Sequence, residues 1–154
     1  MYEYTNIKKE KGFTLVELLV VMAVLAVLAG GLIVAINPAD KIKQANDTKV
    51  QNDISQIASA ASGFAANNEG GFPSASSDLV PSELTVYPSP PGGTGYSAYV
   101  LIGYPGGCTA AAKNCVSVTV TGNLTSSKYT GYTTWRYDSS TARACAWNGS
   151  ACKP

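Results

Sequence analysis

Residues 13–36 read FTLVELLVVMAVLAVLAGGLIVAI, and this stretch decides the architecture of the chain. Twenty of its 24 residues are apolar, and Glu17 is its only charged residue. At about 1.5 Å per residue, a helix of this length spans about 36 Å, enough to cross a hydrocarbon core of roughly 30 Å. Lys8, Lys9 and Lys11 precede the stretch and are expected to stay cytoplasmic. We therefore predict a membrane-spanning helix, with the residues after it on the outside.

Glu17 is not explained by a generic export signal. A cleaved secretory signal has an apolar region of about 7–15 residues, shorter than this one, so a plain signal anchor fits the length better. A carboxylate inside a membrane helix is costly and by default suggests function. Two interpretations stay open: Glu17 snorkels to the near interface, or it pairs with an amine created at Phe13 by cleavage after Gly12. That pair would form within one chain or between two chains.

The stretch KGFTLVEL at residues 11–18 resembles the prepilin signature of type IV pilins and related pseudopilins. The resemblance covers roughly residues 8–36 and implies a leader of residues 1–12 that is removed after Gly12 by a membrane prepilin peptidase. It further implies that Phe13 becomes the N-methylated mature N-terminus. Glu17 would be the assembly carboxylate, which neutralises the N-terminal amine of a neighbouring subunit.

Three residues are candidates for a soft point in the long helix. Gly30 and Gly31 each weaken a helix interior by about 1 kcal/mol relative to Ala. They either allow close helix packing in the membrane or, as the resemblance favours, let the helix stretch when subunits leave the bilayer. Pro38 removes a backbone hydrogen bond, so we expect it to kink or interrupt the helix.

Residues 37–66 are predicted to form an amphipathic helix, the second half of the long N-terminal helix, packed on a sheet. Its charged residues, Asp47 and Asp53 among them, lie mainly off the apolar stripe, and Gly63 and the polar residues that follow are expected to end it. The apolar residues recur mostly at helical spacing: Ile42, Val50, Ile54, Ile57, Ala58, Ala61 and Phe64.

The rest of the chain is predicted to be a long loop followed by a sheet. Residues 67–97 are rich in Gly, Pro and Ser and form the loop, with a short helix near 77–80. Residues 98–154 form the head, and short turns between its strands indicate an antiparallel meander. The predicted fold class is α+β, with a long helix on a roughly four-stranded antiparallel sheet, as in the pilin head. The strand patterns lie at 97–104, 115–122, 129–138 and 142–147.

Four cysteines follow residue 107 and suit two disulfides in an oxidising compartment. They form two pairs with equal spacing, Cys108 with Cys115 and Cys145 with Cys152. We favour these local pairs, although the sequence leaves cross-pairing open. Zinc is disfavoured because zinc sites usually have closer ligand pairs.

The composition argues against enzymatic catalysis by this chain. It has no His, and its net charge is +1, so neither the commonest general base nor a strong attraction to polyanions is present. We find no nucleophile–base pair, so we predict that the protein is not an enzyme and needs no cofactor or metal. After Glu83 only Asp138 is acidic, which does not support the calcium site of some secretion pseudopilins and favours a true pilus subunit.

The charges are distributed unevenly outside the apolar helix. Residues 37–83 hold three Lys and six acids, a charge of −3, whereas residues 84–154 hold five Lys or Arg and one acid, a charge of +4. Either the two regions attract one another between subunits, or the charges are scattered and solvated. Five spread cations give DNA binding little support.

The resemblance therefore implies a structural subunit, a major-type pilin, of a filament used for adhesion, twitching motility or DNA uptake. A minor pilin or type II secretion pseudopilin is the alternative, and a plain membrane-anchored domain is a further one. The expected partners are other copies of the chain in a helical homopolymer, the prepilin peptidase and the inner-membrane assembly machinery, with DNA or host surfaces as further candidates. The precursor would lie in the inner membrane and the assembled subunit on the cell surface.

Overall fold

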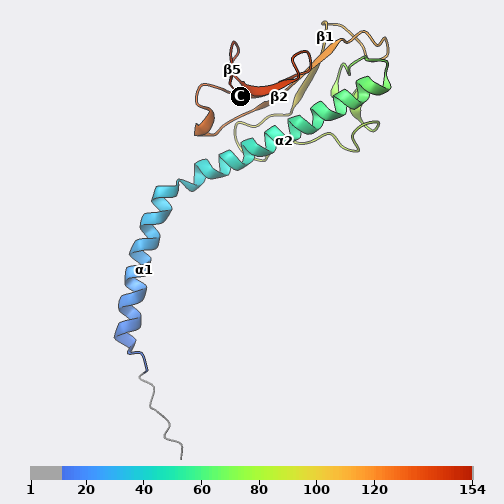
Figure 1. Ribbon diagram of the computed structural model, residues 1–154. Coiled ribbons are helices and arrows are strands. Elements are labelled where there is room, and N and C mark those ends of the chain that lie inside the picture. Colours follow the sequence, from blue (N-terminus) through green and yellow to red (C-terminus); the bar gives the residue numbers. More distant parts are fainter. Residues whose placement is uncertain (1–11, 154) are drawn as a thin grey trace, which may run out of the picture. The chain divides into compact units, whose positions relative to one another are not determined.

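The computed structural model describes residues 12–153, so residues 1–11 of the expected leader lie outside the described part. The chain divides into two compact units, one ending at Pro38 and the other, the head, beginning at Ala39. It contains two long helices and an antiparallel sheet of five strands (Figure 1). The predicted α+β class is therefore confirmed, and the strand count is one higher than expected.

Helix α1 spans Leu15–Ile36 and is continuous through Gly30 and Gly31. Its hydrogen bonding ends at Asn37, which caps the helix in the left-handed conformation with φ 47°. Pro38 is then the first residue of the next helix, a position where its missing N–H costs nothing because that donor would have no helical partner. The helical run is thus interrupted at the Asn37–Pro38 step.

Helix α2 spans Pro38–Asn67 and carries the face that packs in the head. Gly63, expected to begin the end of the helix, lies inside it, and the helix ends at Asn67, among the polar residues that were expected to end it. Ile42, expected on the buried stripe, is 63% exposed, because the stripe is covered only further along the helix. The buried residues of α2 are Asp47, Val50, Ile54, Ile57, Ala58, Ala60, Ala61 and Ala65.

The sheet has the order β1-β2-β3-β4-β5, and every neighbouring pair is antiparallel. The strand predicted from residue 129 begins five residues later, because Tyr129 ends the short helix η2 at Ser127–Tyr129. The fifth strand was not predicted. The strands are β1 at Val100–Tyr104, β2 at Ser117–Asn123, β3 at Thr134–Asp138, β4 at Arg143–Trp147 and β5 at Cys152–Lys153.

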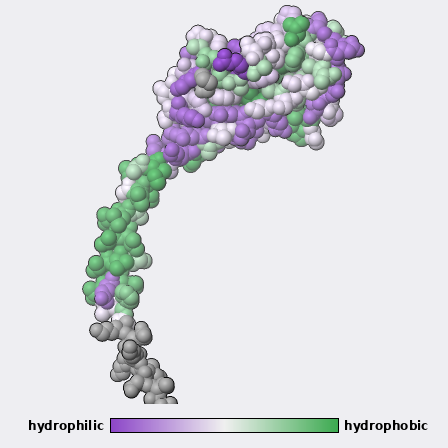
Figure 2. All heavy atoms as spheres, viewed as in Figure 1, coloured by the Kyte–Doolittle hydropathy of each residue, from purple (hydrophilic) through white to green (hydrophobic). Residues whose placement is uncertain are grey.

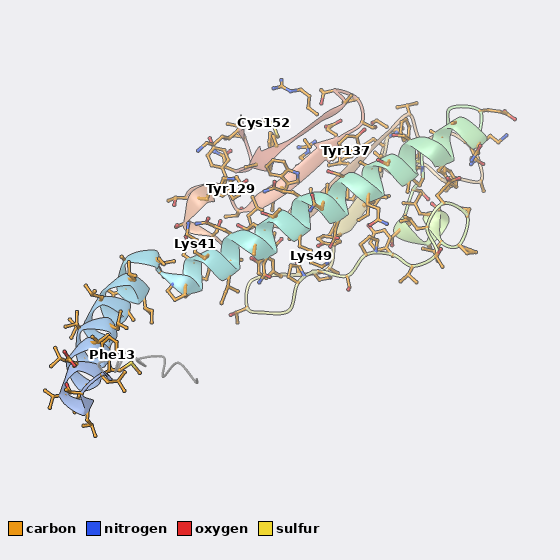
Figure 3. The ribbon with its side chains drawn as sticks, turned by 60° about the horizontal axis from the view of Figure 1, so that its bottom comes forward. Phe13, Lys41, Lys49, Tyr129, Tyr137 and Cys152 are labelled. Atoms are coloured by element: carbon orange, nitrogen blue, oxygen red, sulfur yellow. A yellow bond between two sulfur atoms is a disulfide. The ribbon has the colours of Figure 1, made fainter. Side chains whose placement is uncertain are left out.

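The core lies between α2 and one face of the sheet. Val118 and Val120 of β2 are fully buried, and Tyr129 and Tyr137 lie on the sheet side of α2 (Figure 3). Gly122 follows them on the same face, and a Cβ atom there would come within 2.9 Å of Val50 and 2.8 Å of a ring carbon of Tyr99. Glycine at this position therefore lets the helix approach the sheet closely.

Asp47 is the main departure from the predicted helix face. It is 1% exposed, although its charge placed it off the buried stripe. Its carboxylate accepts hydrogen bonds from the backbone N–H groups of Thr125 and Ser126, both at 3.0 Å, and from the Tyr96 hydroxyl at 2.8 Å. A buried carboxylate is tolerated only when it is bonded in this way. Asp47 thus ties the loop after β2 to the helix.

The other acids of residues 37–83 also have partners within the head. Asp40 lies about two helical turns before Asp47 and has a similar role, since it accepts hydrogen bonds from the N–H and the hydroxyl of Ser127 at 2.9 and 2.7 Å. Most of the acids in this region therefore form hydrogen bonds or ion pairs within the subunit. The remaining contacts are Asp53 with Lys49 and Tyr99, Glu69 with Lys113, Asp78 with Ser74 and Ala75, and Glu83 with Asn67.

We predict that Asp47→Ala destabilises the head by about 3 kcal/mol, because it leaves one buried and one half-buried backbone donor without an acceptor. Glu69→Ala is the matched control, since its exposed ion pair with Lys113 is worth at most about 1 kcal/mol. Chemical denaturation of both variants in detergent micelles measures the difference. Equal midpoints would contradict the role given to Asp47.

We also predict an acid-side loss of stability that depends on Asp40. Hydrogen bonds from the Ser127 backbone, the Ser127 hydroxyl and Gln44 lower the pKa of Asp40 below its ordinary 3.8. A lowered folded-state pKa gives stability that is present above 3.8 and is lost as the pH falls through the folded value. Thermal unfolding followed from about pH 6 to about pH 2 should show a shallower decline for Asp40→Asn than for the unchanged chain. The same decline in both would contradict this account.

Candidate processing and assembly site at the start of α1

The junction between Gly12 and Phe13 lies outside any helix. Residues 12–14 have no regular secondary structure and are exposed, and the Phe13 side chain is 87% exposed. The peptide bond after Gly12, the predicted cleavage site, therefore lies in an exposed segment. Helix α1 begins only two residues after Phe13.

Thr14 and Glu17 form a capping box that starts α1. The Glu17 N–H donates to the Thr14 hydroxyl oxygen at 3.3 Å, and Thr14 donates back to Oε2 of Glu17 from its N–H at 2.9 Å and its hydroxyl at 2.8 Å. These bonds satisfy donors that the first helical turn leaves without partners. The geometry also fixes the Glu17 side chain beside the start of the helix.

The sequence analysis identified Glu17 but not the capping role of Thr14. A Thr followed three residues later by Glu, just before an apolar run, is the ordinary pattern of a capping box and was available in the sequence. Both interactions from Thr14 reach the same oxygen, Oε2, and among residues 12–153 no hydrogen bond reaches Oε1. That oxygen can accept a further donor.

The surface of α1 is apolar on all sides. None of its 22 residues is buried, and Figure 2 shows hydrophobic side chains along the visible length of the helix, apart from a hydrophilic patch near its start. The helix is long and apolar enough to cross a membrane. An apolar surface of this size is favourable only against apolar neighbours.

An exposed Gly–Phe junction, a carboxylate in the first helical turn and a helix apolar enough to cross a membrane thus follow one another at the start of the described chain. Residues 7–33 match the family model described as "Prokaryotic N-terminal methylation motif". This motif is the class III leader of type IV pilins, so the N-terminal segment of the chain is type IV pilin-like. Comparison with curated proteins and with solved structures gives no match.

Two disulfides close local loops in the head. The structure joins Cys108 to Cys115 across the connection between β1 and β2, and Cys145 to Cys152 between β4 and β5. The Cα atoms lie 5.1 and 5.6 Å apart, within the ordinary range for disulfides. In the chain-entropy model each loop contributes about 2.5 kcal/mol. No group of three or more acidic or cysteine side chains within residues 12–153 is placed to hold a metal ion.

We predict that Thr14→Ala loosens the first turn of α1, whereas Thr14→Ser preserves it. Loss of an N-cap costs about 1 kcal/mol, which corresponds to roughly five-fold faster amide exchange at Glu17. Hydrogen exchange followed by NMR of the precursor in micelles measures the rate, and Leu28 in mid-helix provides the internal reference. Equal exchange at Glu17 in the two variants would contradict the capping role.

Proposed function

We propose that this protein is a major-type pilin, the structural subunit of a type IV pilus. In this account the peptidase removes the leader after Gly12, Phe13 is methylated, and α1 moves from the bilayer into the core of a surface filament. The head remains outside the helical bundle and forms the filament surface. The filament serves adhesion, twitching motility or DNA uptake, and the subunit itself performs no reaction.

The observation that carries the proposal is the absence of any buried residue in α1. A soluble domain does not leave 22 consecutive helical residues without packing partners. A lipid bilayer supplies such partners before assembly, and the α1 helices of other copies supply them afterwards. One apolar surface therefore serves both states.

Glu17 provides the difference between the two states. In the bilayer its charge is costly, because Thr14 is its only hydrogen-bonding partner among residues 12–153. After cleavage, the Phe13 amine of a neighbouring copy is a cation of matching depth and can donate to the free Oε1. Pairing removes an isolated charge from the apolar surroundings, and it sets the register between subunits.

The two disulfides and the exposed head support a role outside the cell, where disulfides persist. The Gly30–Gly31 step and the interruption at Pro38 are proposed as the soft points at which the helix adjusts during assembly. A minor pilin or secretion pseudopilin would share these features and would differ in abundance and filament length.

We predict that Glu17→Ala leaves the protein stable in the membrane but prevents filament formation. The substitution removes the cost of placing a carboxylate in the bilayer, so membrane insertion is unaffected. It also removes the partner of the Phe13 amine of a neighbouring copy, so the register between subunits is lost. Expression in a host that supplies the peptidase and the assembly machinery, followed by shearing and electron microscopy, measures filaments against membrane-bound protein.

Glu69→Ala is the matched control, because it removes an acid from the exposed surface of the head. It should assemble like the unchanged chain. Filaments of normal number from Glu17→Ala would contradict the proposed role of Glu17. Filaments that are sparse and short from the unchanged chain would support the minor-pilin or pseudopilin alternative instead.

A further inference from the structure

The sheet face opposite to α2 carries a groove of about 220 Å³ over β3, β4 and β5. Side chains alternate along a strand, and Trp135 and Tyr137 of β3 pack against the core. Arg136 and Asp138 therefore project from the other face. Arg143 lies opposite Asp138, and Cys152 lies opposite Trp147, in neighbouring strands. This register places Arg143, Trp147 and Cys152 around the same groove.

Arg136 is held rigidly at the base of this groove. Its guanidinium lies 4.8 Å from the centre of the Trp147 ring and donates to Asp138 at 2.9 Å. Its Nε–H is buried, yet no hydrogen-bond acceptor meets it in the described part of the chain. A buried donor without a partner costs free energy. The part of the guanidinium that a ligand in the groove could reach is the exposed part of this side chain, which is 26% exposed.

Arg143 supplies a second cation at the rim. Its side chain is exposed, and no ion pair or hydrogen bond engages it within residues 12–153. The two arginines therefore present donors from neighbouring strands on one face, and guanidinium groups suit planar carboxylates.

Asp138 gives the groove an acceptor as well. Burial alone would raise the pKa of Asp138, but hydrogen bonds from Ser140 and the adjacent Arg136 outweigh it and lower the pKa. The carboxylate is therefore ionised at neutral pH and can accept hydroxyl donors. Trp147 and the Cys145–Cys152 disulfide form the apolar wall.

We propose that this groove binds an acidic sugar residue, a uronic acid, of an extracellular polysaccharide. The sugar carboxylate would take the free donors of Arg136 and Arg143, its hydroxyl groups would donate to Asp138, and its C–H face would lie against the Trp147 wall. The volume is below the roughly 300–1,000 Å³ of pockets for drug-sized ligands, so the groove fits one ring of a chain.

The same residues disfavour nucleic acid as the ligand. The phosphate backbone of DNA offers no hydroxyl donors to Asp138. Binding of single strands also depends on a track of cations with aromatic platforms, whereas only two cations line this groove. The proposal concerns the individual subunit and does not require filament assembly.

The test uses the full chain in nonionic micelles, with trigalacturonate as the probe and isothermal titration as the readout. We expect saturable binding, at least five-fold weaker binding to Arg143→Gln, and loss of binding when the probe's carboxylates are methyl-esterified. Arg143→Gln is suitable because the residue is exposed and unpaired in the described structure, so folding should be retained. Lys41→Gln, an exposed charge on α2, is the matched control and should bind as the unchanged chain does.

Several results would overturn the proposal. The absence of saturable binding would do so directly. Equal binding of the methyl ester would show that the carboxylate is not recognised. Equal weakening by Lys41→Gln would reduce the effect to general charge attraction, and equal binding of an oligothymidylate of the same charge would make the groove a site for polyanions in general.

Discussion

An apolar helix with none of its 22 residues buried is the constraint on which the rest of this protein depends. Because lipid tails are as apolar as leucine side chains, moving α1 from a bilayer into a bundle of identical helices gains little hydrophobic free energy. Packing and charge must therefore decide between the two states. Glu17, the one charge in the helix, is expensive in lipid and has an unused oxygen, so we propose that its neutralisation is the term that favours a filament.

The head is different, because there the second helix must be held to the sheet and to the loops beside it. Helix α2 does this with an apolar stripe and with acids that bond to loops, of which Asp47 is fully enclosed. Gly122 allows the close approach of helix and sheet. Most of the acids of residues 37–83 are hydrogen-bonded within the subunit. Fewer of them are therefore available to pair with Arg143 of another copy than the charge of −3 for this region suggests.

The sequence predicts those features that are local and leaves out those that depend on distant contacts. The apolar helix and Glu17 follow from hydropathy and from a motif of eight residues, and the α+β class follows from alternating strand patterns. Asp47 could not be placed, because its burial depends on N–H groups 78 and 79 residues further along the chain. Strand β5 has only two residues and carries no pattern. The groove beside Arg136 depends on the register of three strands, which spacing alone does not fix.

The intact mass of the protein sheared from the surface of expressing cells tests the central claim most directly. The account predicts the loss of residues 1–12, the gain of one methyl group on Phe13 and four hydrogen atoms fewer than the reduced chain, for two disulfides. That mass would show that the same molecule has been cleaved, exported and oxidised to two disulfides. A full-length mass, recovered only from membranes, would contradict the account and leave a plain anchored domain.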